Sequence, residues 1–341
     1  MEKYNNGFFV RELDKGMGTA VANRTYFRKN ENWGQLSHRV SLGNTLLHKT
    51  GKSDFIFTRN AIASGKLLTA GRHLQHGDED QPSRNLEVFS NCSTSISSFI
   101  QLLLLLNGSG VGRNYSDEFM LTSWNNLPKV TLSISHLHQD AMKCGSAIST
   151  IDARGLDCDI WHNVDDSREG WARALELLET QAYMGSRDLH IGLDFSLIRK
   201  EGSPIGGMQN RPASGPHVLM DAFAKIVLMR ESSFPIWKQT MMIDHFAAEC
   251  VANGGARRAA RIAVKYWKDD GIFDFINLKR ENPWMWSSNN SVGCDEEFWF
   301  DAKRKSKTHA SEVFDAICEA SYSHGTGEPG FLNLDKLTVK E

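Results

Sequence analysis

The sequence predicts an α/β protein whose strands form a largely parallel sheet. Short apolar stretches with the composition or alternation of strands recur along the chain, and helix-like segments separate successive stretches. Because strand–helix–strand units join parallel strands, the sheet is either open or closed into a barrel. The five stretches are residues 86–91 (LEVFSN), 129–135 (KVTLSIS), 189–196 (LHIGLDFS), 260–267 (ARIAVKYW) and 330–335 (GFLNLD).

The composition indicates a compact protein without a global charge. The chain has 341 residues, of which 40% are hydrophobic and only 8 are proline, enough for one large core or two ordinary ones. A formal charge of −2 provides no field that would attract nucleic acid or an anionic membrane. We therefore expect no direct nucleic-acid or membrane partner, and any anionic ligand must be bound locally.

The first part of the chain is predicted to be helical. Residues 1–80 place apolar positions at helical spacing and show no strand-like alternation. Turn-forming residues gather in 73–85 (HLQHGDEDQPSRN), which suggests a boundary between a helical region, 1–80, and an α/β region, 81–341. The start of the chain lacks the continuous apolar segment of a signal peptide, so we expect a cytoplasmic protein.

Two helices of the α/β region can be assigned from sequence. The run 99–108 (FIQLLLLLNG) is half the roughly 20 residues that cross a bilayer, so it predicts a buried helix. A second helix is expected after Asp166, with Glu169 as its capping partner. Its apolar stripe consists of Trp171, Ala174, Leu175 and Leu178.

Six dispersed cysteines without a CxxC pair indicate neither a disulfide scaffold nor a zinc site. For Cys92 two interpretations remain open. It is either a small buried hydrophobic residue, as most free cysteines are, or a reactive thiol. A position at the end of a strand and before a helix N-terminus, which would stabilise a thiolate, favours the reactive interpretation.

Residues 108–113 (GSGVGR) have the composition of a phosphate-binding loop, because glycines let backbone amides approach an anion. A dinucleotide fingerprint requires a preceding strand and a third glycine. Here the preceding run is helical and the third glycine is missing. A nicotinamide-dependent dehydrogenase is thus a weak alternative.

Three other segments carry candidate ligand-binding groups. Residues 212–216 (PASGP) are either an ordinary turn or a phosphate loop before a helix. The basic cluster in 254–265 either contacts phosphate or pairs with carboxylates, or it is a solvated face. His136 and His138 lack a third ligand, so we predict no metal site. The basic residues are Arg257, Arg258, Arg261 and Lys265.

The order of several motifs is more specific than any one of them. In succession they resemble the first half of the catalytic chain of adenosylcobalamin-dependent (class II) ribonucleotide reductases, and most closely the monomeric triphosphate-reducing branch. The resemblance covers about residues 24–334. The motifs are RTYFRKNENW, AGRHLQHGDEDQPSRNLEVFSNCS, LNGSGVGRNYS, VDDSREGWARAL, LDFSLIRKEGSPIGG, ASGP, NGGARRAARIAV, WMWSSNNSV and GTGEPGF.

This resemblance implies a fold and a chemistry. The family has a ten-stranded α/β barrel of two five-stranded parallel halves around a finger loop, and the five strand candidates match the first half. An adenosylcobalamin-derived radical makes a thiyl on the finger-loop cysteine, which activates the ribose, and two further cysteines supply electrons. Cys92 matches one of this reducing pair.

The resemblance also implies binding residues and partners. Asn91, Gly108, Gly110 and Gly112 match positions that line the substrate site. Effector or phosphate-loop candidates are Ser214, Gly215, Arg257 and Arg258. Expected partners are a ribonucleoside triphosphate, a deoxynucleotide effector and a thioredoxin-like reductant.

The family's finger-loop motif, Asn-x-Cys-x-Glu, is absent from this sequence, as are the second reducing cysteine and the other half-barrel. Cys294 is not taken for the missing cysteine, because its neighbours match another stretch. The last strand candidate also lies close to the end of the sequence. We therefore expect the N-terminal part of a reductase that is active only with a complementary C-terminal chain. An inactive remnant or a nucleotide-binding regulatory module is the alternative.

Overall fold

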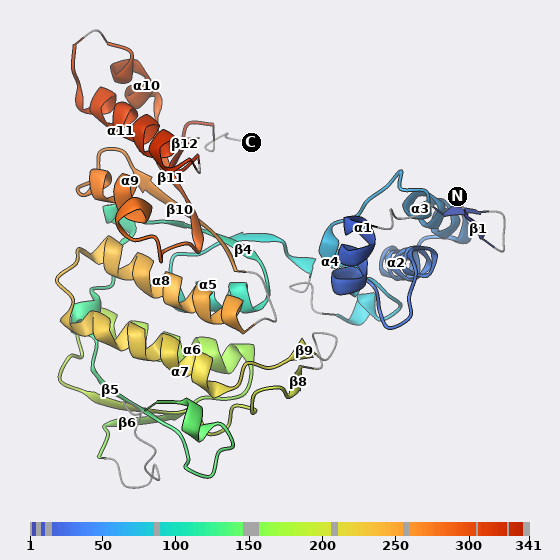
Figure 1. Cartoon of the computed structure of the whole chain (residues 1–341), viewed down its shortest axis with the longest axis horizontal. Coiled ribbons are helices and arrows are strands. Elements are labelled where there is room, and N and C mark those ends of the chain that lie inside the picture. Colours follow the sequence, from blue (N-terminus) through green and yellow to red (C-terminus); the bar gives the residue numbers. More distant parts are fainter. Residues whose placement is uncertain are drawn as a thin grey trace. The chain divides into compact units, whose positions relative to one another are not determined.

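The computed structural model of the chain describes residues 2–4, 8–10, 16–84, 89–145, 157–205, 211–254, 259–304, 306–325 and 327–336. The chain divides into two compact units, Met1–Asn91 and Cys92–Glu341. Figure 1 colours the first unit in blue tones and the second from cyan to red. None of the described helices is long and apolar enough to span a membrane.

The first unit is mainly helical. Its core joins α2 to α3 and α4 through Trp33, Leu36, Val40, Ile62 and Leu74. Two short antiparallel strands, β1 (Glu2–Tyr4) and β2 (Phe8–Val10), which the prediction of a helical region did not include, pair near its start. The helices are α1 (Met17–Val21), α2 (Trp33–His48), α3 (Lys52–Ala63) and α4 (Gly71–His76).

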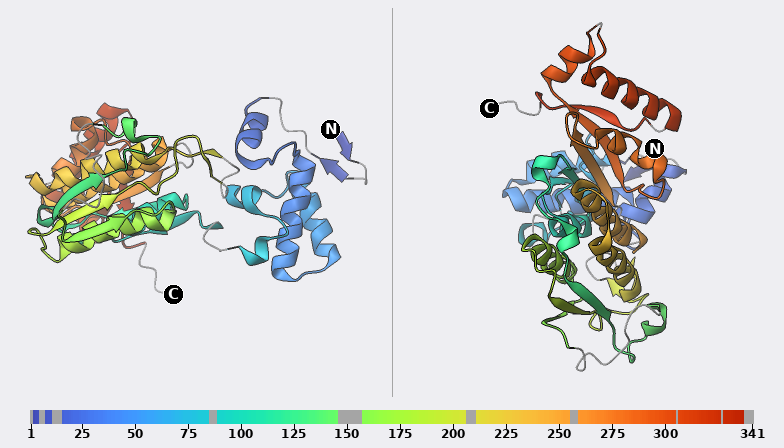
Figure 2. Two further views of the ribbon diagram at one scale, coloured as in Figure 1. Left: turned by 90° about the horizontal axis from the view of Figure 1, so that it is seen from below. Right: turned by 90° about the vertical axis from the view of Figure 1, so that its left-hand side faces the viewer.

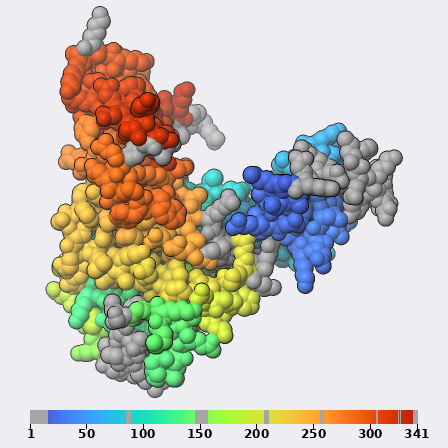
Figure 3. Space-filling view, viewed as in Figure 1, coloured from blue at the N-terminus to red at the C-terminus, as the bar shows by residue number. Residues whose placement is uncertain are grey.

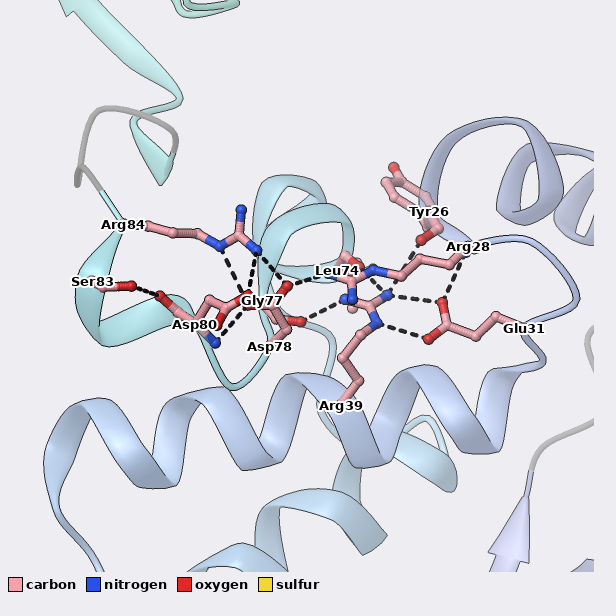
Figure 4. A network of polar contacts seen from close by, with 10 residues as sticks. All are labelled: Tyr26, Arg28, Glu31, Arg39, Leu74, Gly77, Asp78, Asp80, Ser83 and Arg84. Atoms are coloured by element: carbon pink, nitrogen blue, oxygen red, sulfur yellow. Dashed lines mark hydrogen bonds and ion pairs between the residues drawn. The ribbon is translucent and has the colours of Figure 1, made fainter. Parts of the chain in front are cut away.

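A buried polar network fixes the end of α4 against α2 (Figure 4). Arg39 donates to the carbonyls of Leu74 and Gly77, at 3.0 and 2.5 Å, and pairs with Glu31 at 2.7 Å. The carboxylate of Asp78 accepts hydrogen bonds from Arg28 and Arg84. The two bonds from Arg39 to Leu74 and Gly77 satisfy carbonyls at the C-terminus of α4 that the helix itself leaves unpaired.

The second unit contains a five-stranded parallel sheet in the order β12-β11-β10-β4-β3 and a three-stranded parallel sheet in the order β5-β7-β6. The strands of the larger sheet are β3 (Cys92–Thr94), β4 (Gly110–Asn114), β10 (Ala260–Tyr266), β11 (Ser288–Cys294) and β12 (Gly330–Asn333). Those of the smaller sheet are β5 (Lys129–Ser133), β6 (Ile160–Asn163) and β7 (His190–Asp194). A short antiparallel pair joins β8 (Pro204–Ile205) and β9 (Arg211–Pro212).

Four of the five strand predictions, 129–135, 189–196, 260–267 and 330–335, are confirmed. The prediction for 86–91 is wrong in its described part, because residues 89–91 are not in a strand and β3 begins only at Cys92. The predicted strands do not form one sheet, since β5 and β7 belong to the smaller one. β4, β6 and β11 were not predicted.

Helices α6, α5, α8 and α7 pack in that order, and one continuous hydrophobic core joins them to both sheets. Figure 1 shows α7 beside α8, Figure 2 gives two other views of the unit, and in Figure 3 the yellow and orange side chains of α7 and α8 lie at the surface. The bounds are α5 (Ser98–Leu106), α6 (Arg168–Tyr183), α7 (Pro216–Val227), α8 (Ile236–Asn253), α9 (Ile272–Glu281), α10 (Glu296–Ala302) and α11 (His309–His324).

Both helices predicted in the α/β region are present. α5 covers most of the leucine-rich run, and Leu102 and Leu105 are buried. α6 begins one residue later than predicted, because Ser167, whose side chain accepts from the amide of Gly170, is its N-cap. Asp166 instead pairs with Arg199 at 2.7 Å.

Candidate active site on the open face of the sheet

The five-stranded sheet has one covered face and one open face. Cys92 lies opposite Gly110 and Thr94 opposite Gly112, while Gly110 and Gly112 lie opposite Ala260 and Ile262 on the next strand. Because alternate residues of a strand share a face, these six residues lie on the same side. Cys92, Thr94, Ala260 and Ile262 are all exposed, Ile262 at 51%.

The residues between them face the helices and are buried, among them Val111, Arg113, Arg261 and Ala263. Parallel sheets are normally covered on both faces. The described residues of this unit therefore leave uncovered a surface that parallel sheets normally bury.

Cys92 differs from most other cysteines of the chain in its exposure. All six cysteines are free, and only Cys92 and Cys318 are exposed. Burial raises the pKa of Cys250 and Cys294, each to about 12, so these two are inert thiols. Of the two interpretations of Cys92, the buried hydrophobic residue is therefore wrong.

The structure corrects the local argument for a Cys92 thiolate. Cys92 opens β3 rather than ending a strand, and the next helix, α5, begins six residues later. The N-terminus of α5 is already occupied by a carboxylate, because the amides of Ser98 and Phe99 donate to Glu179 at 2.9 to 3.0 Å. The dipole of this helix stabilises Glu179, and exposure is what distinguishes Cys92.

The glycine-rich segment 108–113 is not a loop. Gly108, with φ of +78°, follows α5, and Gly110 and Gly112 lie within β4, between β3 and β10. Glycines held in a strand cannot form the turn of a dinucleotide fingerprint, which removes the main support for a dehydrogenase.

Gly112 is not required by the packing of the described chain. A Cβ there would lie 3.8 Å from Thr94 Cγ2, an ordinary contact distance. Gly110 and Gly112 thus form a strip of β4 without side chains beside Cys92. The packing of the described residues does not explain why position 112 is a glycine. A ligand or another polypeptide segment that approaches the backbone closely would account for it.

At the carboxyl ends of β4, β10 and β11, a cavity of about 140 Å³ opens on the same face. The rise per residue of a strand places it about 13 Å along β4 from the level of Cys92. It is lined by Asn114, Ser116, Glu118, Val264, Tyr266, Gly293 and Leu334.

The helix-covered face carries a buried ionic network that the sequence did not indicate. Arg113 donates to Asp244 at 2.9 Å, Tyr115 donates to the same carboxylate at 2.6 Å, and Arg261 donates to the Tyr115 hydroxyl at 2.5 Å. Burial raises the pKa of Tyr115, so its hydroxyl stays protonated. Lys265 is fully buried and pairs with Asp117 at 2.7 Å. The solvated-face interpretation of the basic cluster is therefore wrong for Arg261 and Lys265.

Of the other predicted site residues, the structure describes Gly215, Ser214 and Asn91. Gly215, with φ of +77°, precedes α7, and a Cβ there would lie 2.8 Å from Asp140 Oδ2, so conformation and packing both require glycine. Ser214 donates weakly to the carbonyl of Gly215 at 3.4 Å. Asn91 is exposed and donates to the carbonyl of Phe89. Arg257 and Arg258 lie outside the described residues.

Of the histidine pair, His138 has a structural explanation. His138 bonds to the carbonyl of Ile198 through Nε2, and its Nδ1 accepts from the amide of Asp140. Both ring nitrogens are thus engaged. Within the described ranges, no group of three or more His, Cys, Asp or Glu side chains is arranged to hold a metal ion.

Comparisons with known proteins agree with the resemblance in the sequence. A protein of Mycobacterium phage D29, provisionally named an adenosylcobalamin-dependent ribonucleoside-triphosphate reductase, is 29% identical over 95% of this chain and 51% of its own length. The adenosylcobalamin-dependent ribonucleoside-triphosphate reductase of Lactobacillus helveticus is 25% identical over 94% of this chain and 48% of its own length. No protein-family model matches.

A solved structure of similar fold was also found. A crystal structure of a B12-dependent (class II) ribonucleotide reductase superposes with a TM-score of 0.67 at 19% identity, over 93% of this chain and 49% of that one. The chain thus spans about half the length of the relatives it matches. Over nearly its whole length the chain is similar in sequence to proteins named adenosylcobalamin-dependent ribonucleoside-triphosphate reductases, and similar in fold to a class II ribonucleotide reductase.

Proposed function

We propose that this chain supplies the first half-barrel of an adenosylcobalamin-dependent ribonucleoside-triphosphate reductase, with Cys92 as one of the two reducing cysteines. The observation that carries the proposal is the exposed thiol of Cys92 on an uncovered sheet face, beside the bare strip of Gly110 and Gly112. In a ten-stranded barrel this face would be the inner one, covered by the complementary half and the finger loop.

The chemistry assigned to Cys92 is a two-electron reduction. In each turnover the 2′ hydroxyl of the ribose is replaced by hydrogen and leaves as water. Two thiols provide the two electrons and two protons and end as a disulfide. Cys92 is one of them, its partner belongs to the complementary half, and a thioredoxin-like dithiol restores both by thiol–disulfide exchange. The exposure of Cys92 suits that exchange, which requires access to the sulfur.

Adenosylcobalamin supplies the initiating radical when bound. We expect it to bind together with the complementary half, and the roles proposed for this chain involve only its own residues. Gly110 and Gly112 admit the substrate close to the backbone of β4, and the cavity at the carboxyl end of β4 and β10 extends the same surface.

A triphosphate substrate is favoured over a diphosphate. The relatives that match more than nine-tenths of this chain are named as triphosphate reductases, whereas the diphosphate reductase of Mycobacterium tuberculosis matches 27% of it. A deoxynucleotide effector would bind near Ser214 and Gly215, together with Arg257 and Arg258.

Complementation tests this proposal. The chain is mixed with a reductase half that carries Asn-x-Cys-x-Glu, adenosylcobalamin, CTP and a dithiol, and dCTP is measured. We expect turnover with the natural chain and with Cys318→Ser, which removes the other exposed thiol, and none with Cys92→Ser. Absence of dCTP from a mixture whose two halves demonstrably associate would refute the reductase assignment.

A nucleotide-binding regulatory module or an inactive remnant is the second candidate. In a regulatory module, Cys92→Ser leaves nucleotide binding and its regulatory effect unchanged. Nucleotide binding without turnover in any mixture would favour the module, and neither binding nor turnover would favour the remnant.

A further inference from the structure

The segment that carries Cys92 is held by few contacts of its own. β3 has three residues, lies at the end of the sheet order and pairs with β4. The ladder continues for one bond, from the amide of Ser95 to the carbonyl of Gly112 at 3.0 Å. Ile96, which follows, is 77% exposed, so apolar burial does not anchor the connection to α5.

Arg113 reaches this connection from the covered face of the sheet. Its Nη2 donates to the carbonyl of Ile96 at 2.9 Å, and its Nη1 donates to the hydroxyl of Ser98 at 2.9 Å. The guanidinium is in turn fixed by Asp244, which accepts at 2.9 and 3.1 Å. Ile96 and Ser98, which accept these hydrogen bonds, lie four and six residues after Cys92.

The charge of Arg113 is secured by its surroundings. Burial alone would lower the pKa of Arg113, but Asp244, Tyr115 and Glu179 together outweigh burial and the pKa is raised. Glu179 holds the next turn of chain through the amides of Ser98 and Phe99. The connection after β3 is thus held between a guanidinium from β4 and a carboxylate from α6.

We propose that Arg113 is a positioning residue for Cys92: by its grip on Ile96 and Ser98 it fixes the end of β3 and so the place of the thiol. The inference rests on the proposed function for the role of the thiol, but not for the fixing itself. The buried guanidinium of Arg113 thus acts on Cys92 through the segment that it holds. Lysine would keep the charge opposite Asp244 but not the fork of donors that reaches two sites.

The test uses a nitroxide label on the protein and measures its mobility by electron paramagnetic resonance. Cys92 is labelled in a Cys318→Ser background, and Cys318 in a Cys92→Ser background. In Arg113→Met the carboxylate of Asp244 keeps the Tyr115 hydroxyl and Arg261, at 3.9 Å, as partners, so the charge of Asp244 is not left unpaired. Arg187→Met, which removes another arginine bound to backbone carbonyls, is the matched control.

We expect Arg113→Met to make the label at position 92 more mobile, with the label at position 318 unchanged. The amide of Ser95 should exchange about tenfold faster, since charge-assisted bonds that hold its neighbours are lost. Arg113→Lys should recover thermal stability without restoring the immobile spectrum. Ser98→Ala, which removes one contact, gives a smaller change of the same kind.

Equal spectra at position 92 in folded Arg113→Met and natural protein overturn the proposal. So does a gain in mobility of similar size at both labelled sites, which would mean a merely structural role. If the label responds as expected and the complemented enzyme makes no dCTP, the positioning role stands and the reductase assignment fails. If dCTP is made and the label does not respond, only the positioning role fails.

Discussion

The carboxylate of Glu179 on α6 accepts the backbone amide of Ser98, the first residue of α5, at 2.9 and 3.0 Å. Free amides at a helix N-terminus attract an anion, and here a side chain of the same unit supplies it. Burial raises the pKa of Glu179, and the Arg113 guanidinium and the two amides offset only part of that effect. The folded protein thus binds a proton at this site more tightly than the unfolded chain does.

The first prediction follows from this raised pKa. Above pH 4.5, the ordinary value for the side chain, the unfolded chain has released the proton while the folded protein still holds it, so stability falls as the pH rises toward the raised pKa. Glu179→Gln removes this proton. We expect the difference between the free energies of unfolding of Glu179→Gln and of the natural protein to grow in favour of the variant as the pH rises above 4.5. The difference should level off above the raised pKa of Glu179.

Urea denaturation across this pH range measures the difference. Glu176→Gln, on the exposed side of the same helix, is the matched control. If both variants follow the same curve, burial of Glu179 is not the cause of the pH dependence.

A second prediction concerns two strand glycines with opposite surroundings. A Cβ on Gly112 would make only ordinary contacts, so Gly112→Ala should fold and change stability by less than about 1 kcal/mol. A Cβ on Gly192 would lie 2.3 Å from Trp161, so Gly192→Ala should cost about 1–3 kcal/mol. Thermal unfolding compares the two.

The same pair separates function from folding. If the strip beside Cys92 admits a nucleotide, Gly112→Ala should weaken nucleotide binding or complemented turnover although the protein is folded. Unchanged binding and turnover in Gly112→Ala would mean that the strip has no ligand.

How far the sequence predicted the sheet depended on local composition. β5, β7 and β10 are rich in branched and apolar residues and were found. β4 (GVGRN) and β11 (SNNSVGC) read as turns, because glycine, asparagine and serine disfavour strands when considered alone. They are strands because both of their neighbours in the sheet supply hydrogen-bond partners.

The role of Cys92 stays a prediction. The succession of motifs pointed to this residue, and the structure shows that its thiol is exposed. Arg113 and Asp244 are 131 residues apart in the sequence, and no local sequence pattern predicts that they pair. The same holds for Glu179, which read as an ordinary polar position of an amphipathic helix.

A third prediction concerns acid stability of the first unit (Figure 4). Burial alone would raise the pKa of Asp78, but hydrogen bonds from Arg28 and Arg84 outweigh it and the pKa is lowered. The stabilisation is therefore complete above pH 3.8, the ordinary value, and is lost as the pH falls toward the lowered pKa. We expect Asp78→Asn to destabilise this unit by about 1–3 kcal/mol at neutral pH and to cost progressively less in acid.

Hydrogen exchange of peptides from α2 and α4 reports on this unit within the whole chain. Asp80→Asn, whose side chain is 72% exposed, is the control and should leave exchange unchanged. Equal protection of α2 and α4 in the Asp78 variant and the natural protein would show that the two arginines contribute nothing measurable.

The fourth prediction compares two glutamines that are both fully buried, Gln101 on α5 and Gln239 on α8. Within the described part of the chain, neither amide atom of Gln101 has a hydrogen-bond partner. Gln239 accepts from the amide of Trp124 and donates to Asn125 and to the carbonyl of Phe234. A buried amide without hydrogen-bond partners destabilises the fold. Removal of a hydrogen-bonded amide also destabilises the fold, because it leaves the partners unpaired.

Gln101→Leu should therefore raise the free energy of unfolding by about 1–3 kcal/mol, and Gln239→Leu should lower it by a similar amount. Chemical denaturation of both variants gives the two signs under the same conditions. Leucine is close to glutamine in size, so the difference isolates the state of the amide rather than the volume of the side chain. A destabilised Gln101→Leu would mean that the amide is satisfied in solution, by a buried water or by a segment that covers α5.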